Sequence, residues 1–153
     1  MAIVVRAVLC RRVITDQETN AVTLVDCVES LTPKQLPARL PRVILATLWE
    51  RKDATIDGDP TRARVVLRGP DTAETPVIEH ELPSLDFKEK QKRLRVNVNL
   101  QGVEITRPGV HTVSVETASG EQSWDEGASC SFEVVSPNLQ LATSTEPSQE
   151  PRT

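Results

Sequence analysis

Apolar and polar residues alternate along much of this 153-residue chain with the two-residue period of a half-buried β-strand. Residues 94–101 show the pattern most clearly, with apolar side chains at even positions and polar ones at odd positions. Residues 62–68 and 111–116 repeat it. Turn-forming residues separate such runs about every 8–12 residues, a spacing typical of sandwiches. The pattern predicts about eight strands and no convincing helix.

The first strands are expected to form a hairpin. Residues 3–10 are apolar apart from Arg6, residues 15–20 are a polar turn, and residues 22–31 read as the returning strand. Three prolines within residues 33–41 then exclude a helix and a central strand, so this segment is predicted to be an extended crossover between sheets.

The next run, residues 42–50, is nearly all apolar, and its period alone would also fit a buried helix. Its length, the preceding proline and the following turn favour a central strand. Residues 77–82 lie between two prolines and should form an edge strand. Residues 86–93 are charged and fit either one helical turn or the approach to the next strand. Phe132 belongs to the last inward-facing row.

These elements predict an all-β fold, an antiparallel Greek-key β-sandwich over residues 1–136. From Pro137 the chain consists mainly of Ser, Thr, Pro, Gln and Glu. Such a composition buries too little apolar surface to offset its ordering entropy, which predicts a disordered tail over residues 137–153.

The composition indicates the cellular compartment in which the protein is expected. No apolar run reaches the length of a membrane span, and the basic residues follow the N-terminal apolar run instead of preceding it as in a signal peptide. The three cysteines, Cys10, Cys27 and Cys130, are an odd number without CxxC spacing, which indicates a reducing compartment. We therefore expect a cytoplasmic protein without membrane contact.

The net charge of −4 is unevenly distributed. Residues 1–68 hold 11 basic and 8 acidic side chains, whereas residues 69–153 hold 7 and 14. The excess of +3 in the first part is too small for a nucleic-acid-binding surface, so no nucleic-acid partner is expected.

Three stretches point to a family, and they comprise residues 9–10 with 24–28, residues 37–48, and residues 103–115 with the terminal strand 131–135. In these stretches the chain resembles an uncharacterised bacterial family of small β-sandwich proteins, a domain of unknown function. The Arg107-Pro108-Gly109 turn before an alternating strand is also similar to immunoglobulin-like and C2-like sandwiches. The chain departs from that pattern at His111, where an aromatic residue is usual. The resemblance implies a sandwich and a bacterial cytoplasmic setting, but no activity.

Catalytic chemistry finds little support in the pattern. His111 shares a face with two valines and is expected in the core or at its rim, and His80 reads as structural or exposed. Neither accompanies a Gly-x-Ser-x-Gly elbow. Cys10 and Cys27 could approach each other on paired strands, yet isolated strand cysteines usually behave as small hydrophobic residues. We expect no cofactor and no resident metal.

Two further polar groups leave alternatives open. The loop aspartates Asp53, Asp57 and Asp59 could hold a cation, or could simply form a turn. The basic stretch 88–95 contains Glu89 and no aromatic residue, as expected for a solvated edge.

Partner binding is the better-supported expectation. The candidate residues are Trp49, Trp124, Arg62, Arg64 and Arg68. Exposed tryptophans are frequent interface anchors, although a tryptophan in such a position is more often part of the core, and the arginine row could instead pair with glutamates across strands. The favoured function is a non-enzymatic accessory module that binds another protein. A small metal-dependent or hydrolytic enzyme, and a phage- or virion-associated structural module, are the alternatives.

Overall fold

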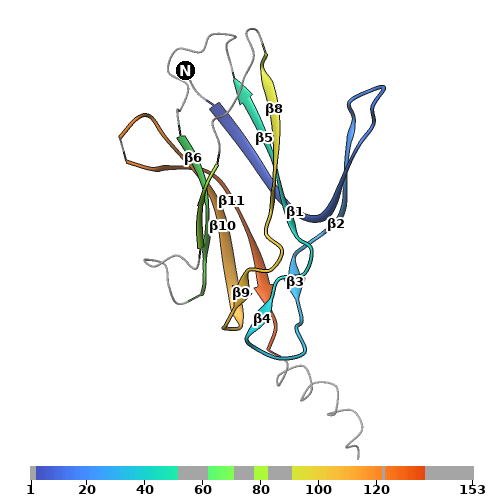
Figure 1. Cartoon of the computed structure of the whole chain (residues 1–153), viewed down its shortest axis with the longest axis vertical. Coiled ribbons are helices and arrows are strands. Elements are labelled where there is room, and N and C mark those ends of the chain that lie inside the picture. The colour runs from blue at the N-terminus through green and yellow to red at the C-terminus, as the bar shows by residue number, and fades with distance from the viewer. Residues whose placement is uncertain (1–2, 52–61, 71–77, 83–90, 122, 137–153) are drawn as a thin grey trace, which may run out of the picture.

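The computed structural model describes residues 3–51, 62–70, 78–82, 91–121 and 123–136 (Figure 1). Every regular element among them is a strand, which confirms the all-β fold. No helix within these residues is long and apolar enough to cross a membrane. The strands are β1 (Ile3–Thr15), β2 (Val22–Cys27), β3 (Ser30–Leu31), β4 (Ala38–Arg39), β5 (Ile44–Arg51), β6 (Arg62–Arg68), β7 (Ile78–Glu81), β8 (Arg93–Asn99), β9 (Glu104–Ile105), β10 (Gly109–Ala118) and β11 (Asp125–Val134).

The strands form two large sheets and one small one. The four-stranded sheet has the order β2-β1-β5-β8, and the five-stranded sheet has the order β3-β11-β10-β6-β7. β4 and β9 pair separately. Every pairing is antiparallel except that of β3 with β11. β7 lies at a sheet edge, as the flanking prolines predict. The Greek-key connectivity stays a prediction.

The two large sheets pack their apolar faces against one shared core. Trp49 and Leu45 of β5 contribute from the four-stranded sheet, and Leu67, Val113 and Phe132 contribute from the five-stranded sheet. The alternation of β5 is complete, with every second side chain buried from Leu45 to Arg51. In β6 and β10, the inward apolar rows of the two-residue pattern are buried as well, with Ala63 and Leu67 on β6 and Val113 and Val115 on β10.

One predicted strand is divided. Residues 22–31 were expected to form a single returning strand, but β2 ends at Cys27 and β3 begins at Ser30 in the other large sheet. Asp26 has a φ of 55°, a left-handed conformation that interrupts the extended chain. The backbone NH of Val28 bonds to the carbonyl of Leu9 at 2.8 Å, which holds the turning point against β1. The proline segment then crosses back from β3 to β5, as predicted.

The first hairpin extends beyond the body of the protein. β1 pairs with β5 over residues 3–10, and beyond Cys10 it pairs only with β2. We call residues 11–27 the hairpin arm, and Figure 1 shows it in blue diverging from the two sheets. At its tip, the Asp16 carboxylate accepts hydrogen bonds from the backbone NH groups of Glu18 and Thr19 at 2.8 and 3.2 Å. These bonds hold the pKa of Asp16 below its usual value.

Several sequence-based expectations lie outside the described residues. They concern the loop aspartates Asp53, Asp57 and Asp59, most of the charged stretch 86–93, and the tail 137–153.

Candidate functional site

The predicted arginine row lies on the outer face of β6, and two of its members meet a tryptophan. The guanidinium carbons of Arg62 and Arg64 lie 4.6 and 4.4 Å from the ring centre of Trp124, which immediately precedes β11. Cations over an indole ring are attracted by its quadrupole. The fold thus brings together three of the five predicted partner-binding residues.

The same arginines are paired with acidic side chains. Arg64 Nε lies 2.7 Å from Glu116 Oε1, and Arg62 Nε lies 2.8 Å from Glu81 Oε1. Arg68 Nη2 lies 3.7 Å from Glu116 Oε2. The hydrogen bond from Arg62 lowers the pKa of Glu81 and raises that of Arg62. Of the two interpretations left open by the sequence, the structure shows pairing across strands.

Trp49 is a correction to the list of surface candidates. Its side chain is fully buried in the shared core, so it offers no surface to a partner. Trp49 lies on the inward face of β5. The residues opposite it on the neighbouring strands, Val5 and Leu94, point into the same core. The sequence alternative of a core tryptophan is the one observed.

The two histidines occupy different environments. His111 is buried, stacks on Phe132 with ring centres 5.3 Å apart, and places Nδ1 3.1 Å from the carbonyl oxygen of Gly109. His80 is exposed on edge strand β7. The described residues include no group of three His, Cys, Asp or Glu side chains placed to hold a metal.

The three cysteines are free thiols, and two of them are neighbours. Cys10 and Cys27 are direct partners across β1 and β2, with Cys10 buried and Cys27 exposed. Burial, followed by the charge of Cys27, raises the pKa of the Cys10 thiol. Burial raises the pKa of Cys130 to about 11. Neither Cys10 nor Cys130 therefore has the lowered pKa of a nucleophilic cysteine.

The outer face of the four-stranded sheet is apolar at its centre, a feature that the sequence analysis missed. Ile44, Ala46 and Leu48 of β5 point away from the core and stay partly exposed. Val8 of β1, opposite Ala46, joins this row. We call these four residues the apolar face. The run 42–50 contained the signal, since apolar residues on both sides of a strand need cover on both sides, and within the described structure only one side faces the core.

Arginines frame this apolar face. Leu48 has Arg6 as its neighbour on β1 and Arg95 as its neighbour on β8, and both arginines are exposed. Residues directly opposite each other project to the same side of a sheet, so Leu48 lies between two cations. Two residues after Leu48, on the same face of β5, Glu50 Oε1 lies 3.3 Å from Arg93 Nε.

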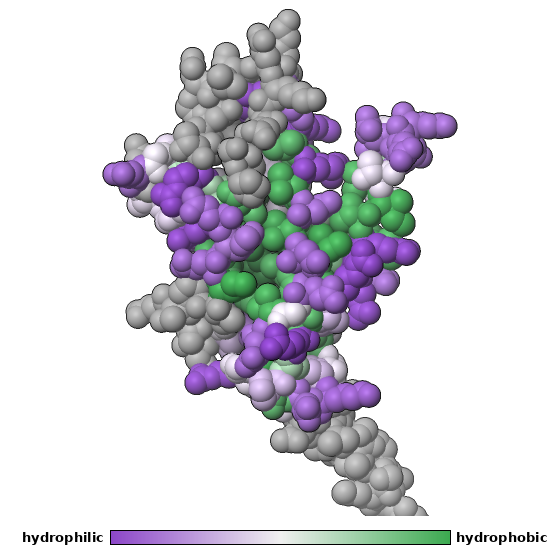
Figure 2. Space-filling model, viewed as in Figure 1, coloured by the Kyte–Doolittle hydropathy of each residue, from purple (hydrophilic) through white to green (hydrophobic). Residues whose placement is uncertain are grey.

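The hairpin arm continues the apolar character. Ile14 is 47% exposed, and Val25 is only partly buried. By the two-residue alternation along β1 and the pairing with β2, both side chains project to the same side as Cys10. Figure 2 shows apolar side chains reaching the surface near the base of the arm, with hydrophilic ones around them.

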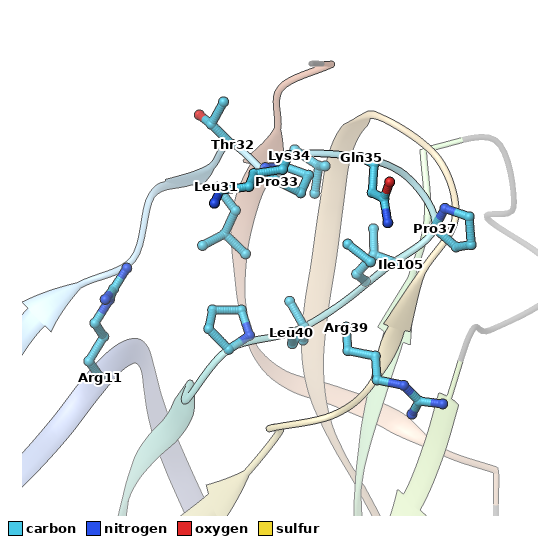
Figure 3. A pocket seen from close by; sticks show the side chains of 13 residues that line it. Arg11, Leu31, Thr32, Pro33, Lys34, Gln35, Pro37, Arg39, Leu40 and Ile105 are labelled. Atoms are coloured by element: carbon cyan, nitrogen blue, oxygen red, sulfur yellow. The ribbon is translucent and has the colours of Figure 1, made fainter.

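A pocket of about 550 Å³ lies inside the loop that joins β3 to β5, and Arg11 at the base of the hairpin arm borders it (Figure 3). Leu31, Leu40, Ile105 and Val134 contribute aliphatic side chains to its wall. The three prolines that predicted a crossover, Pro33, Pro37 and Pro41, line the pocket as well.

A family model matches residues 5–124. The chain belongs to DUF6941, a family of unknown function. No curated protein and no solved structure matches the chain.

The matched DUF6941 region includes most of the features described above. It spans the hairpin arm, the apolar face with its arginines, the loop that joins β3 to β5 and the Arg62–Arg64–Trp124 cluster. It ends before β11, so Val134 of the pocket wall lies outside it. Membership in DUF6941 confirms the expected domain of unknown function.

Proposed function

We propose that this DUF6941 protein is a non-enzymatic accessory module of a bacterial cytoplasmic system, and that it binds another protein through the apolar face. The observation that carries the proposal is Leu48, partly exposed between Arg6 and Arg95 at the centre of a sheet face. A contiguous apolar patch with a polar rim is typical of interaction sites.

The arginines support a particular partner chemistry. Two copies meeting face to face around a twofold axis would bring arginine-rimmed surfaces together, and like charges in an interface are costly. A segment with apolar side chains flanked by aspartate or glutamate would instead satisfy both Leu48 and its neighbours Arg6 and Arg95. The proposed partner is therefore a different protein with such an acidic, apolar segment.

The setting is part of the same proposal. Three free cysteines, with Cys10 and Cys27 adjacent yet unbonded, are compatible with a reducing compartment. The bacterial origin rests on the family resemblance of the sequence.

Site-specific photo-crosslinking tests the proposal. A photoreactive amino acid replaces Leu48 in the protein expressed in its native host, and in a control it replaces Val110, which is 54% exposed on the other large sheet. We expect one protein crosslinked from position 48 and not from position 110, through a peptide that contains apolar and acidic residues. The same products from both positions, or none from position 48, would refute the proposal, and so would crosslinks to a second copy.

Binding measurements with the crosslinked peptide complete the test. The double variant Arg6→Gln/Arg95→Gln should weaken the affinity by about tenfold or more, because charge-assisted contacts are lost. Arg42→Gln, an exposed arginine outside the apolar face, should leave it unchanged. Equal affinity of the unmodified protein and both variants for the peptide would contradict the proposed partner. So would binding to anionic vesicles, instead of to the peptide, that depends on Leu48.

A further inference from the structure

The pocket inside the β3–β5 loop has an aliphatic floor. Leu40, Ile105 and Val134 are at most 4% exposed, and they come from three distant parts of the chain. The pairing of β4 with β9 holds Ile105 opposite Ala38, so one wall is fixed by a small sheet. The volume of about 550 Å³ falls within the range of small-molecule sites.

The rim of the pocket is cationic. Arg11, Lys34 and Arg39 line it and are exposed, and none of the described residues that line it carries a carboxylate. Arg11 and Lys34 make no ion pair with any residue in the described part of the chain. One guanidinium nitrogen of Arg39 donates to the carbonyl oxygen of Gly102 at 3.1 Å, which leaves the remaining donors of that group available.

This combination differs from the arginine cluster on β6. There, Arg62 and Arg64 are paired with glutamates of the same protein. At the pocket, the described residues place no carboxylate beside the three cations that line an apolar cavity. Figure 3 shows Leu31, Leu40 and Ile105 around the opening of the loop, with Arg11 and Arg39 on opposite sides of it.

We propose that this pocket binds an amphiphile that has an aliphatic chain and an anionic head group, either carboxylate or phosphate. The chain would contact Leu40, Ile105 and Val134, and the head would lie at the cationic rim against one of its guanidinium groups. Both head groups match guanidinium donors. Among the described lining residues there is no aromatic side chain on which a nucleobase would stack, so an aliphatic chain suits the pocket better than a nucleotide. This site goes beyond the proposed protein-binding function and lies on other residues.

Isothermal titration of the purified protein with hexanoate, heptanoate and octanoate tests the apolar part. Each added methylene should lower the dissociation constant by about fourfold if it is buried. Octyl phosphate should bind as well, and the tighter of the two eight-carbon ligands identifies the preferred head group. 1-Octanol and octyltrimethylammonium should bind at least about tenfold more weakly, because they lack the negative charge.

Two variants locate the site. Arg11→Gln/Arg39→Gln should weaken octanoate binding by about tenfold or more, whereas Arg42→Gln should not. Both changes are at exposed positions, and thermal unfolding of each variant checks that the fold is retained. Amide NMR shifts on titration should concentrate at residues 31–41 and 103–105.

The outcomes that would overturn the inference are specific. They are equal affinity for octanoate and 1-octanol, affinity independent of chain length, unchanged binding by the rim variant, or shifts confined to the apolar face of the four-stranded sheet. Absence of binding at millimolar octanoate and octyl phosphate would also overturn it. The crosslinking at position 48 is a separate measurement, so the two proposals can fail independently.

Discussion

Trp49 Nε1 donates a hydrogen bond of 3.0 Å to Thr47 Oγ1, two residues earlier on the inward face of β5. Thr47 Oγ1 in turn donates to the carbonyl oxygen of Val96 at 2.5 Å. One threonine hydroxyl thus satisfies the indole of the largest core side chain and links β5 to β8. Buried polar groups need such partners, since an unpaired donor in a core costs its full desolvation energy.

Replacing Thr47 with valine should destabilise the protein. The change keeps the shape of the side chain and leaves the Trp49 NH without its acceptor, so we expect the free energy of unfolding to fall by about 1–3 kcal/mol. Urea denaturation followed by circular dichroism measures it. Thr23→Val on the exposed side of β2 is the matched control and should change stability by less than about 0.5 kcal/mol. Equal stability of the two variants would contradict the role of this hydrogen bond.

The Arg64–Glu116 pair should contribute more to stability than the Arg62–Glu81 pair. The side chains of Arg64 and Glu116 are only 19% and 12% exposed, whereas those of Arg62 and Glu81 are 39% and 53% exposed. Arg64→Met should lower the free energy of unfolding by about 1.5–3 kcal/mol, because it leaves a poorly solvated carboxylate with a weaker partner.

Double-mutant cycles with Arg64→Met/Glu116→Gln and Arg62→Met/Glu81→Gln measure the two coupling energies. The first coupling should be the larger and should persist at high salt, while the second should be reduced by added salt. The prediction fails if the exposed pair shows the stronger coupling.

Gly109 should not tolerate alanine. Its φ is 120°, and a Cβ atom would lie 2.9 Å from Pro70 Cβ, so backbone strain and a steric clash act together. We expect Gly109→Ala to cost more than Gly102→Ala, which has a φ of 89° but no atom within 4 Å of the added Cβ. Strained backbone positions of this kind cost about 1–3 kcal/mol each. Thermal unfolding of both variants tests this order, and a smaller loss at Gly109 would contradict it.

Thiol reactivity should differ sharply among the cysteines. Cys27 is exposed and should react first with a thiol reagent at pH 8. Cys130, whose pKa is raised to about 11 by burial, is then almost entirely protonated. Its labelling rate should rise about tenfold per pH unit up to that pKa, because the thiolate is the reactive form.

Mass spectrometry of the labelled peptides assigns each rate. Cys27→Ser removes the fast phase and serves as the control, and unfolding in urea should make the remaining two thiols react alike. A rate at Cys130 that levels off near pH 8 would contradict the effect of burial on its pKa.

The periodic strands could be predicted from the sequence because their signal is local. In residues 62–68 the alternation placed Ala63 and Leu67 inward, and the structure buries both. The division of residues 22–31 could not be predicted, because it depends on the left-handed Asp26 and on the separate pairing of β3 with β11. The same limit applies to Trp49, whose burial depends on the strands that flank it.

The candidate sites divide in a similar way. The sequence identified Arg62, Arg64 and Trp124 as residues of interest, but their contact joins two strands that are distant in the chain. It could not place Leu48 between Arg6 and Arg95, since that arrangement requires the register of three strands.

By itself, the sequence determined the all-β class, the inward rows and the proline crossover, because a strand's two-residue period and proline's missing NH act within a few residues. The tertiary structure alone decided which apolar residues remain partly exposed, which arginines form ion pairs with glutamates, and where cations line a cavity. Those properties depend on strand order and register, which bring together residues as far apart as Arg11 and Ile105.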